Sequence, residues 1–186
     1  MRIVAGAWRG RTLAAPLGEA TRPTADRVRQ VLFDMLLHAP WAGRERIVGA
    51  RVLDAFAGTG ALGLEALSRG AAEAVFIESR RAALTVLRAN IAACRAEPRC
   101  RVLPGDATAP PPGTACQLIF LDPPYGQGLI GRAIPALRAR GWLAAGALLA
   151  VEVARDEATL DGLGEVLASR VVGAARIEIF REPPGQ

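Results

Sequence analysis

Asp122-Pro123-Pro124-Tyr125 is a tetrad whose residue types could hold a planar amine. The carboxylate of Asp122 and the carbonyl of Pro123 can each accept one N–H of an exocyclic NH2 group, and Tyr125 offers a ring on which a base can stack. Two consecutive prolines fix φ and carry no N–H, so the loop backbone is stiff. Asp and Pro are also common turn residues, so the tetrad alone could equally be a simple turn.

The tetrad occupies a position in the chain where chemistry is expected. It directly follows the apolar run Leu118-Ile119-Phe120-Leu121, which is typical of a strand buried on both faces of a parallel sheet. In open α/β sheets, ligands bind in the crevice beyond the carboxyl ends of the strands. The tetrad is therefore expected on the loop that borders this crevice.

A second candidate site is the glycine turn that runs from Asp54 to Gly60, after a short apolar strand. Gly58 and Gly60 permit positive φ and close approach of a ligand to the backbone, at the N-terminus of a predicted helix. With Gly63 the turn also satisfies G-x-G-x-x-G, so a nicotinamide dinucleotide oxidoreductase is an alternative, with Glu78 as the ribose-binding acid. Against it, Asp54 would repel a pyrophosphate, and the tetrad has no role in hydride transfer.

Together the two motifs resemble the S-adenosylmethionine-dependent amino-methyltransferases, in which the cofactor loop follows the first strand and a D-P-P-Y loop follows the fourth. S-adenosylmethionine carries an ammonium and a sulfonium, beside which a carboxylate is favourable. Glu78 could accept both ribose hydroxyls, and Asp106 could accept from the adenine amine. We assign Asp122, Pro123, Pro124 and Tyr125 to catalysis. To cofactor binding we assign Thr24, Asp54, Gly58, Gly60, Glu78, Asp106 and Ala107.

Strands and helices alternate from Arg51 onward, which favours a doubly wound sheet. Strands are expected at 52–55, 74–77, 101–103, 118–121 and 148–153, helices at 61–69, 80–96 and 129–140, and a closing antiparallel pair at 166–172 and 175–180. We predict an α/β, Rossmann-like, mostly parallel sheet over residues 46–186. Residues 1–45 are predicted to form a basic extension, a hairpin or arm followed by a helix that opens at Pro23–Thr24.

Composition narrows the class of protein further. A chain of 186 residues with 51% hydrophobic residues suits one domain. It shows no apolar stretch long enough for a membrane helix and no signal peptide, so we expect a cytoplasmic, monomeric protein without a membrane partner. The three cysteines lack C-x-x-C spacing and His38 is the only histidine, so neither a metal site nor a histidine triad is expected.

The net charge of +5 is concentrated in residues 1–29, which hold six arginines against Glu19 and Asp26. A basic segment on a near-neutral domain is typical of a nucleic-acid partner. The alternatives are solvated surface charge or ion pairs with acids of the main domain, for which Arg27 is the first candidate. The predicted RNA contacts are Arg9, Arg11, Arg22, Arg27 and Arg29.

The N-terminal segment also carries a more specific resemblance. Residues 2–11 (RIVAGAWRGR) and 22–33 (RPTADRVRQVLF), with the two motifs above, resemble the bacterial small-subunit (16S) ribosomal RNA guanine-N2 methyltransferase family. The resemblance implies methyl transfer from S-adenosylmethionine to N2 of one guanine, with ribosomal RNA as partner, within a small-subunit assembly, and no metal. A DNA or RNA adenine-N6 methyltransferase remains an alternative, although 186 residues leave no room for a target-recognition domain. A non-enzymatic RNA-binding domain would not require Asp54, Glu78 and the tetrad together.

Overall fold

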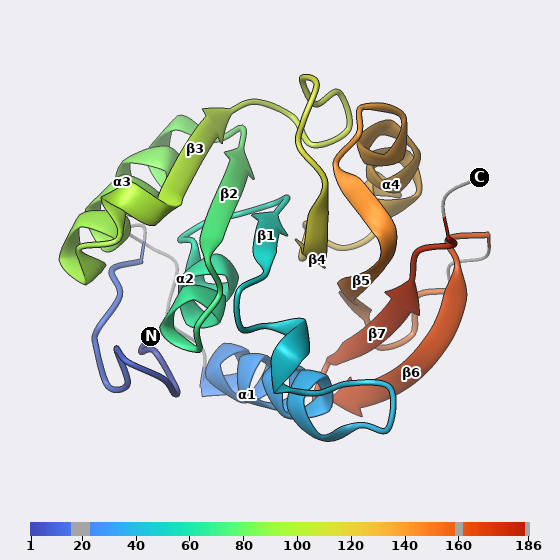
Figure 1. Cartoon of the computed structure of the whole chain (residues 1–186), viewed down its shortest axis with the longest axis horizontal. Helices are drawn as coiled ribbons and strands as arrows, with labels where there is room; N and C mark the ends of the chain where they lie inside the picture. Colours follow the sequence, from blue (N-terminus) through green and yellow to red (C-terminus); the bar gives the residue numbers. More distant parts are fainter. Residues whose placement is uncertain (16–22, 159–161, 185–186) are drawn as a thin grey trace.

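The computed structural model describes residues 1–15, 23–158 and 162–184. Within them the strands form one seven-stranded sheet in the order β3-β2-β1-β4-β5-β7-β6 (Figure 1). The strands are β1 (Arg51–Asp54), β2 (Glu73–Glu78), β3 (Cys100–Pro104), β4 (Cys116–Leu121), β5 (Leu143–Ala154), β6 (Glu165–Val172) and β7 (Ala175–Arg181). The helices are α1 (Pro23–His38), α2 (Ala61–Ser68), α3 (Arg81–Cys94) and α4 (Leu129–Ala139), with short 3-10 turns at Arg44–Arg46 and Glu97–Arg99.

The five strands β3, β2, β1, β4 and β5 are parallel, whereas β7 pairs antiparallel with β5 and β6 pairs antiparallel with β7. The predicted mostly parallel, Rossmann-like sheet with an antiparallel C-terminal pair is confirmed. The chain order reverses on either side of β1, since β2 and β3 lie to one side and β4 and β5 to the other. Such a reversal opens a crevice at the carboxyl ends of the strands.

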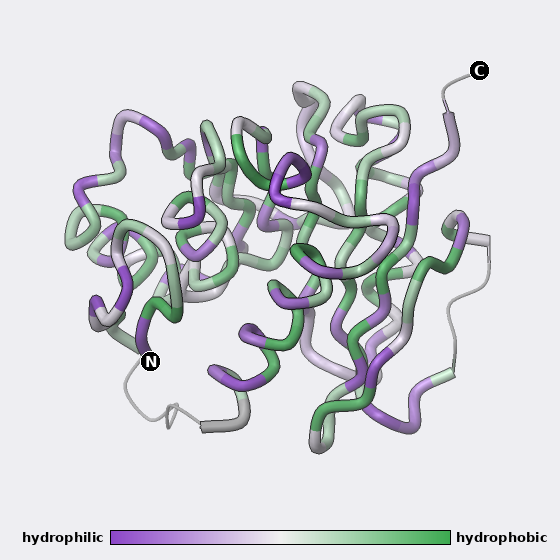
Figure 2. Tube along the Cα trace, turned by 60° about the horizontal axis from the view of Figure 1, so that its bottom comes forward, coloured by the Kyte–Doolittle hydropathy of each residue, from purple (hydrophilic) through white to green (hydrophobic). Residues whose placement is uncertain are grey.

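The two faces of the sheet carry separate apolar cores. Of the described helices, α1, α2 and α3 contribute to the core that contains Val52, Phe76 and Phe120. Helix α4 covers the opposite face, where its apolar side chains pack with Leu121 and Trp142. Helix α1 alternates between purple and green along its turns in Figure 2, as expected of a helix with one apolar face. Among the described residues, no helix is both long and apolar enough to cross a membrane.

The N-terminal segment is joined to the sheet domain. Its hairpin is reduced to one antiparallel bridge between Arg2 and Thr12, and the carbonyl of Arg11 accepts from the N–H of Ile3 at 3.0 Å. Ile3 and Leu13 are buried in the same core as α1 and the sheet. The apolar core therefore runs across the boundary predicted near residue 45.

Strand β5 is the element whose predicted start differs most from the structure. It begins at Leu143 rather than near residue 148, and the pairing register with β4 shifts between Cys116 and Leu118. Gly146, at φ 69°, adopts a left-handed conformation within the strand. The Ala- and Gly-rich stretch before Leu148 lacks the apolar alternation by which a strand is recognised, so the pattern alone missed it.

Candidate active site

Four acidic side chains follow one another across neighbouring strand ends of the sheet. Asp54 ends β1 and Glu78 ends β2, while Asp122 follows β4 and Glu152 lies near the end of β5. Asp54 is in register with Phe76 and Phe120, so Glu78 and Asp122 lie two residues further along the adjacent strands and project to the same face. Val151 pairs with Leu121, which brings Glu152 level with Asp122. We call Asp54, Glu78, Asp122 and Glu152 the acidic row.

The glycine turn is bound to two members of the acidic row. The N–H of Gly58 donates to Glu78 Oε2 at 2.7 Å, and the N–H of Gly63 donates to Asp54 Oδ2 at 3.0 Å. Gly60 has φ 78°, and a Cβ there would lie only 2.3 Å from Cδ1 of Leu87. Only glycine fits this position, so the turn can pass closely against Leu87 of α3.

Beside the acidic row lies a cavity of about 290 Å³. A smaller cavity of about 30 Å³ shares Phe56, Glu78 and Asp106 with it and is also lined by Ala107. Cofactor and catalytic residues predicted from separate motifs therefore meet in one place. The larger cavity is lined by Phe56, Glu78, Ser79, Arg80, Asp106, Asp122, Pro124, Gln127 and Leu129.

The loop that carries the Asp122–Tyr125 tetrad makes a contact that the sequence did not predict. Tyr125 Oη donates a hydrogen bond to Glu152 Oε1 at 2.6 Å, and the tyrosine is 44% exposed. Glu152 was overlooked because it lies inside the apolar run from Leu148 to Val153. An acidic residue interrupting such a run was the available signal.

Burial and like charges raise the pKa values of Asp54, Asp122 and Glu152. Desolvation is the main cause for Asp54, whose pKa rises to about 7, with a further increase from Glu78 and an opposing hydrogen bond from Gly63. The pKa of Asp122 is raised by desolvation and by the negative charges of Glu152 and Asp54. The Asp122 side chain nevertheless keeps solvent access, so desolvation alone explains little of the rise in its pKa. We attribute the rise mainly to repulsion from the two neighbouring carboxylates. Desolvation also raises the pKa of Glu152, against the hydrogen bond from Tyr125.

Asp106 is an exposed carboxylate outside the acidic row. The N–H of Thr108 donates to Asp106 Oδ1 at 2.8 Å, and this hydrogen bond lowers the pKa of Asp106. Asp106 is therefore a charged acceptor at the rim of the cavity. Asp54, Asp122 and Glu152 have raised pKa values, and a ligand that carries positive charge would favour their ionised forms.

The predicted RNA-binding arginines fall into different environments. Arg9, Arg11 and Arg27 are exposed, although Arg11 also donates to the carbonyl of Ala93. Arg29 is only 4% exposed, and its guanidinium pairs with Asp26 at 2.9 Å and with Glu65 at 3.6 Å. Among the residues that the structure describes, the ion pair with an acid of the main domain forms at Arg29 and not at Arg27. We therefore remove Arg29 from the proposed RNA contacts.

Two predicted site residues lie outside what the structure describes. Arg22 falls outside the described residues. Thr24 belongs to the first turn of α1, but its side chain is likewise outside the description. Among the described residues, no group of three or more potential metal-ligating side chains is found.

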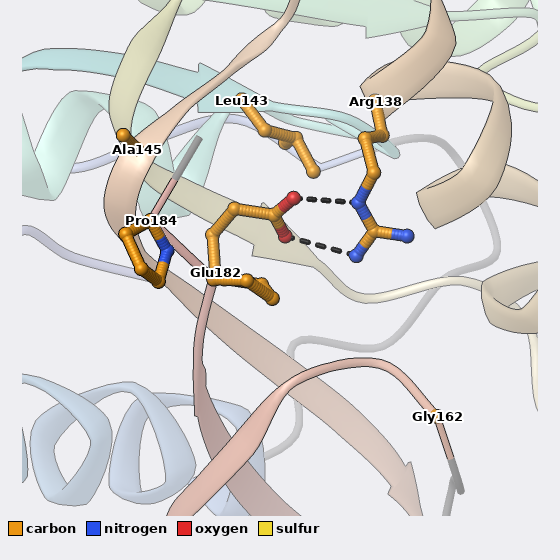
Figure 3. A pocket seen from close by; sticks show the side chains of 7 residues that line it. Arg138, Leu143, Ala145, Gly162, Glu182 and Pro184 are labelled. Carbon is orange, nitrogen blue, oxygen red and sulfur yellow. Dashed lines mark hydrogen bonds and ion pairs between the residues drawn. The ribbon is translucent and has the colours of Figure 1, made fainter. Parts of the chain in front are cut away.

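A larger cavity, of about 480 Å³, lies at the other end of β5 (Figure 3). It is lined by Leu143 at the start of this 12-residue strand, whereas Glu152 is near its end. Its charged side chains neutralise each other, because Arg138 binds Glu182 through Nε at 2.5 Å and Nη2 at 2.9 Å. No residue predicted to act in catalysis or cofactor binding lines it, so size alone does not mark the functional site here.

Comparison with known proteins shows the family to which the chain belongs. The family model described as conserved hypothetical protein 95 matches residues 1–181. Over 154 residues, 82% of this chain and 74% of the relative, the chain is 46% identical to ribosomal RNA small subunit methyltransferase D of Escherichia coli. The chain belongs to this methyltransferase family. The family predicted from the N-terminal segment and the two motifs is thereby confirmed.

Solved structures of family members and of more distant methyltransferases share the fold. A putative methyltransferase from Escherichia coli superposes with a TM-score of 0.83 at 38% identity, over 100% of this chain and 99% of that one. A Thermus thermophilus 16S rRNA N2 methyltransferase in complex with AdoMet and guanosine superposes with a TM-score of 0.70 at 20% identity, over 90% of this chain and 45% of that one. The second likeness shows a common fold only.

Proposed function

We propose that this protein transfers a methyl group from S-adenosylmethionine to the exocyclic N2 amine of one guanine in 16S ribosomal RNA. The observation that carries the proposal is the acidic row, in which Asp54 and Asp122 meet beside the glycine turn. The relatives named ribosomal RNA small subunit methyltransferase D support the RNA substrate. The resemblance of residues 2–11 and 22–33 to the guanine-N2 family supports the target atom. We place the reaction in the cytoplasm, carried out by a monomer on RNA within a small-subunit assembly.

The residues around the cavity suit S-adenosylmethionine. Asp54 and its neighbours supply negative charge for an ammonium and a sulfonium, which explains why mutually repelling carboxyl groups lie together. Glu78 is anchored by the N–H of Gly58 and retains acceptor positions for ribose hydroxyls. Asp106 and Ala107 border the cavity where we place the adenine. When bound, S-adenosylmethionine supplies the methyl group on its sulfonium.

The tetrad orients the target amine in this proposal. Guanine N2 is a poor nucleophile because its lone pair is delocalised into the ring, so the site must hold the nitrogen in line with the methyl donor. Asp122 and the carbonyl of Pro123 accept its two N–H groups, and such positioning can lower a barrier by roughly 7–11 kcal/mol at best. The raised pKa of Asp122 makes its carboxylate a suitable acceptor for the proton released after transfer. A paired base would have to leave its stack to reach Tyr125.

Two other activities would use parts of the same site. Adenine N6 presents the same pair of N–H donors to the tetrad, so an adenine-N6 methyltransferase differs from our proposal only in the base. A nicotinamide dinucleotide would bring its pyrophosphate to the glycine turn, where Asp54 lies behind Gly63. The family relationship favours methyl transfer to ribosomal RNA over the oxidoreductase. The resemblance of residues 2–11 and 22–33 favours guanine over adenine.

Isothermal titration calorimetry with S-adenosylmethionine and with NAD tests the cofactor assignment directly. We expect saturable binding of S-adenosylmethionine and S-adenosylhomocysteine and none of NAD. The variant Glu78→Ala should weaken S-adenosylmethionine binding by about 1–3 kcal/mol, the cost of leaving hydrogen-bonding groups unpaired. Binding of NAD with S-adenosylmethionine excluded would overturn the proposal.

A further inference from the structure

We infer that Glu152 is a positioning residue of this reaction, because it accepts the hydrogen bond that fixes the Tyr125 ring on which the target base stacks. The inference rests on the proposed function and names a residue outside the tetrad and the glycine turn. In this role Glu152 does not touch the substrate. It acts through the phenol of Tyr125, 2.6 Å from its Oε1.

The strand pairing explains how Glu152 reaches the catalytic loop. Because Leu121 pairs with Val151, the chain beyond β4 and the last residues of β5 remain side by side where the tetrad begins. Val151 and Val153 are buried in the α4-side core, so Glu152 projects from the other face, toward which Asp122 also projects. The carboxylate is thus held by a rigid strand next to the loop that it supports.

The hydrogen bond removes the freedom that the loop backbone leaves to Tyr125. Pro123 and Pro124 restrict φ up to the residue before the tyrosine, but Gly126 follows at φ 73°, in a conformation that glycine adopts easily. The orientation of the ring is then set by its own side-chain torsions. A phenol that donates to a carboxylate at 2.6 Å makes a short, charge-assisted hydrogen bond, which is strong enough to select one orientation of a partly exposed ring.

Stability alone does not account for a glutamate at this position. The residue belongs to a strand whose neighbours Val151 and Val153 are buried, and its antiparallel partner in β7 is Ile177. A half-buried carboxylate beside Asp122 costs free energy through desolvation and like-charge repulsion. An apolar side chain would fit the strand better, so the arrangement is explained by the contact with Tyr125.

Tyr125 is the only tyrosine in the chain, so its hydroxyl can be observed without interference. We propose to label the full-length protein with tyrosine carrying 13C at Cζ and to compare the wild type with Glu152→Ala, Glu152→Gln and Tyr125→Phe. The single Cζ signal should move toward that of a solvated tyrosine in Glu152→Ala. It should stay near the wild-type position in Glu152→Gln, because the amide oxygen can still accept the hydrogen bond. An unchanged signal in Glu152→Ala would overturn the inference.

Steady-state methylation of ribosomal RNA then tests the consequence for the reaction. Glu152→Ala and Tyr125→Phe should each lower kcat/KM for RNA about tenfold, the effect of losing one hydrogen bond to a charged group. The double variant Glu152→Ala/Tyr125→Phe should have a kcat/KM no lower than that of the less active single variant. Glu152→Gln should retain most of the wild-type kcat/KM. Melting temperature should not fall below the wild-type value, and S-adenosylmethionine affinity should stay at the wild-type value. Additive losses, or a variant Glu152→Ala as active as the wild type, would contradict positioning through Tyr125.

The two measurements separate failure of this inference from failure of the proposed function. If wild-type protein methylated no ribosomal RNA, the proposed function would fall and the catalytic role of Glu152 with it, while the Cζ signal would still report the contact. If the wild type were active and the Cζ signal did not respond to Glu152→Ala, only the positioning role would be rejected.

Discussion

The guanidinium of Arg29 in α1 lies 3.6 Å from the carboxylate of Glu65 in α2, and both side chains are buried. The same carboxylate accepts hydrogen bonds from the N–H groups of Val4 and Ala5 at 2.8 and 2.9 Å, and from Nε of Arg69 at 2.8 Å. Glu65 therefore joins α1, α2 and the first residues of the chain. Part of the N-terminal basic segment is a structural clasp on the sheet domain.

Replacing Arg29 by Gln should lower the free energy of unfolding by about 3–5 kcal/mol, because a buried Glu65 loses one of its cationic partners. Urea denaturation followed by circular dichroism measures this loss of stability.

Arg27→Gln is the matched control, since Arg27 lies in the same helix but is exposed. It should change stability by no more than about 0.5 kcal/mol. If Arg27 contacts a phosphate, the control should also reduce the salt slope of RNA binding by about one unit. Equal stability losses in both variants would contradict the clasp.

Asp122→Ala should abolish methyl transfer while S-adenosylmethionine binding stays within a few fold of the wild type. The reason is that Asp122 is assigned to the target amine and not to the cofactor. Calorimetry and a methylation assay on the same preparation separate the two effects. Loss of cofactor binding together with activity would place Asp122 in the cofactor site instead.

Cofactor binding should depend on pH through Asp54, whose pKa is about 7. Below this value the carboxyl group is protonated and neutral, and above it the group carries the charge that attracts a cationic cofactor. Affinity should therefore rise as pH increases through 7. Binding near pH 7 should release protons, because the bound cation favours the ionised form. Titrations in two buffers of different ionisation enthalpy measure the release. Asp54→Asn should remove most of it, and persistence of the full release in that variant would exclude Asp54 as its source.

Asn90 connects the N-terminal arm to the cofactor turn. Its side chain is 1% exposed; Oδ1 accepts from the N–H of Ala14 at 2.8 Å, and Nδ2 donates to the carbonyls of Ala14 and Thr59 at 3.1 and 2.9 Å. Asn90→Ala should lower stability by about 2 kcal/mol or more and weaken S-adenosylmethionine binding, since the buried backbone groups lose their partners. Thr85→Ala, exposed on the same helix, is the control. Cofactor affinity unchanged in Asn90→Ala would show that the arm and the turn are not coupled.

Local patterns were sufficient to predict the strand and helix order. Buried parallel strands such as Leu118–Leu121 are continuous apolar runs, and the residues at their ends therefore mark the crevice. The predicted sites Glu78, Asp106, Ala107, Asp122 and Pro124 meet at the cavities because the carboxyl ends of parallel strands share one edge of the sheet.

Contacts between side chains distant in sequence could not be predicted in this way. Arg29 and Glu65 are 36 positions apart, and nothing in either helix alone tells a buried arginine from an exposed one such as Arg27. Glu152 acquires its role only once the register of β4 and β5 places it beside Tyr125. Asn90 carries no local signal at all, since a single Asn on a helix is usually a surface residue.

Mass-spectrometric mapping of methylated nucleosides in 16S ribosomal RNA, from cells with and without this protein, tests the central claim most directly. The account predicts that one N2-methylguanosine is missing from cells that lack the protein. It also predicts that purified protein with S-adenosylmethionine restores this modification, and that the Asp122→Ala variant does not. Identical N2-methylguanosine in both RNAs, or loss of an N6-methyladenosine instead, would contradict it.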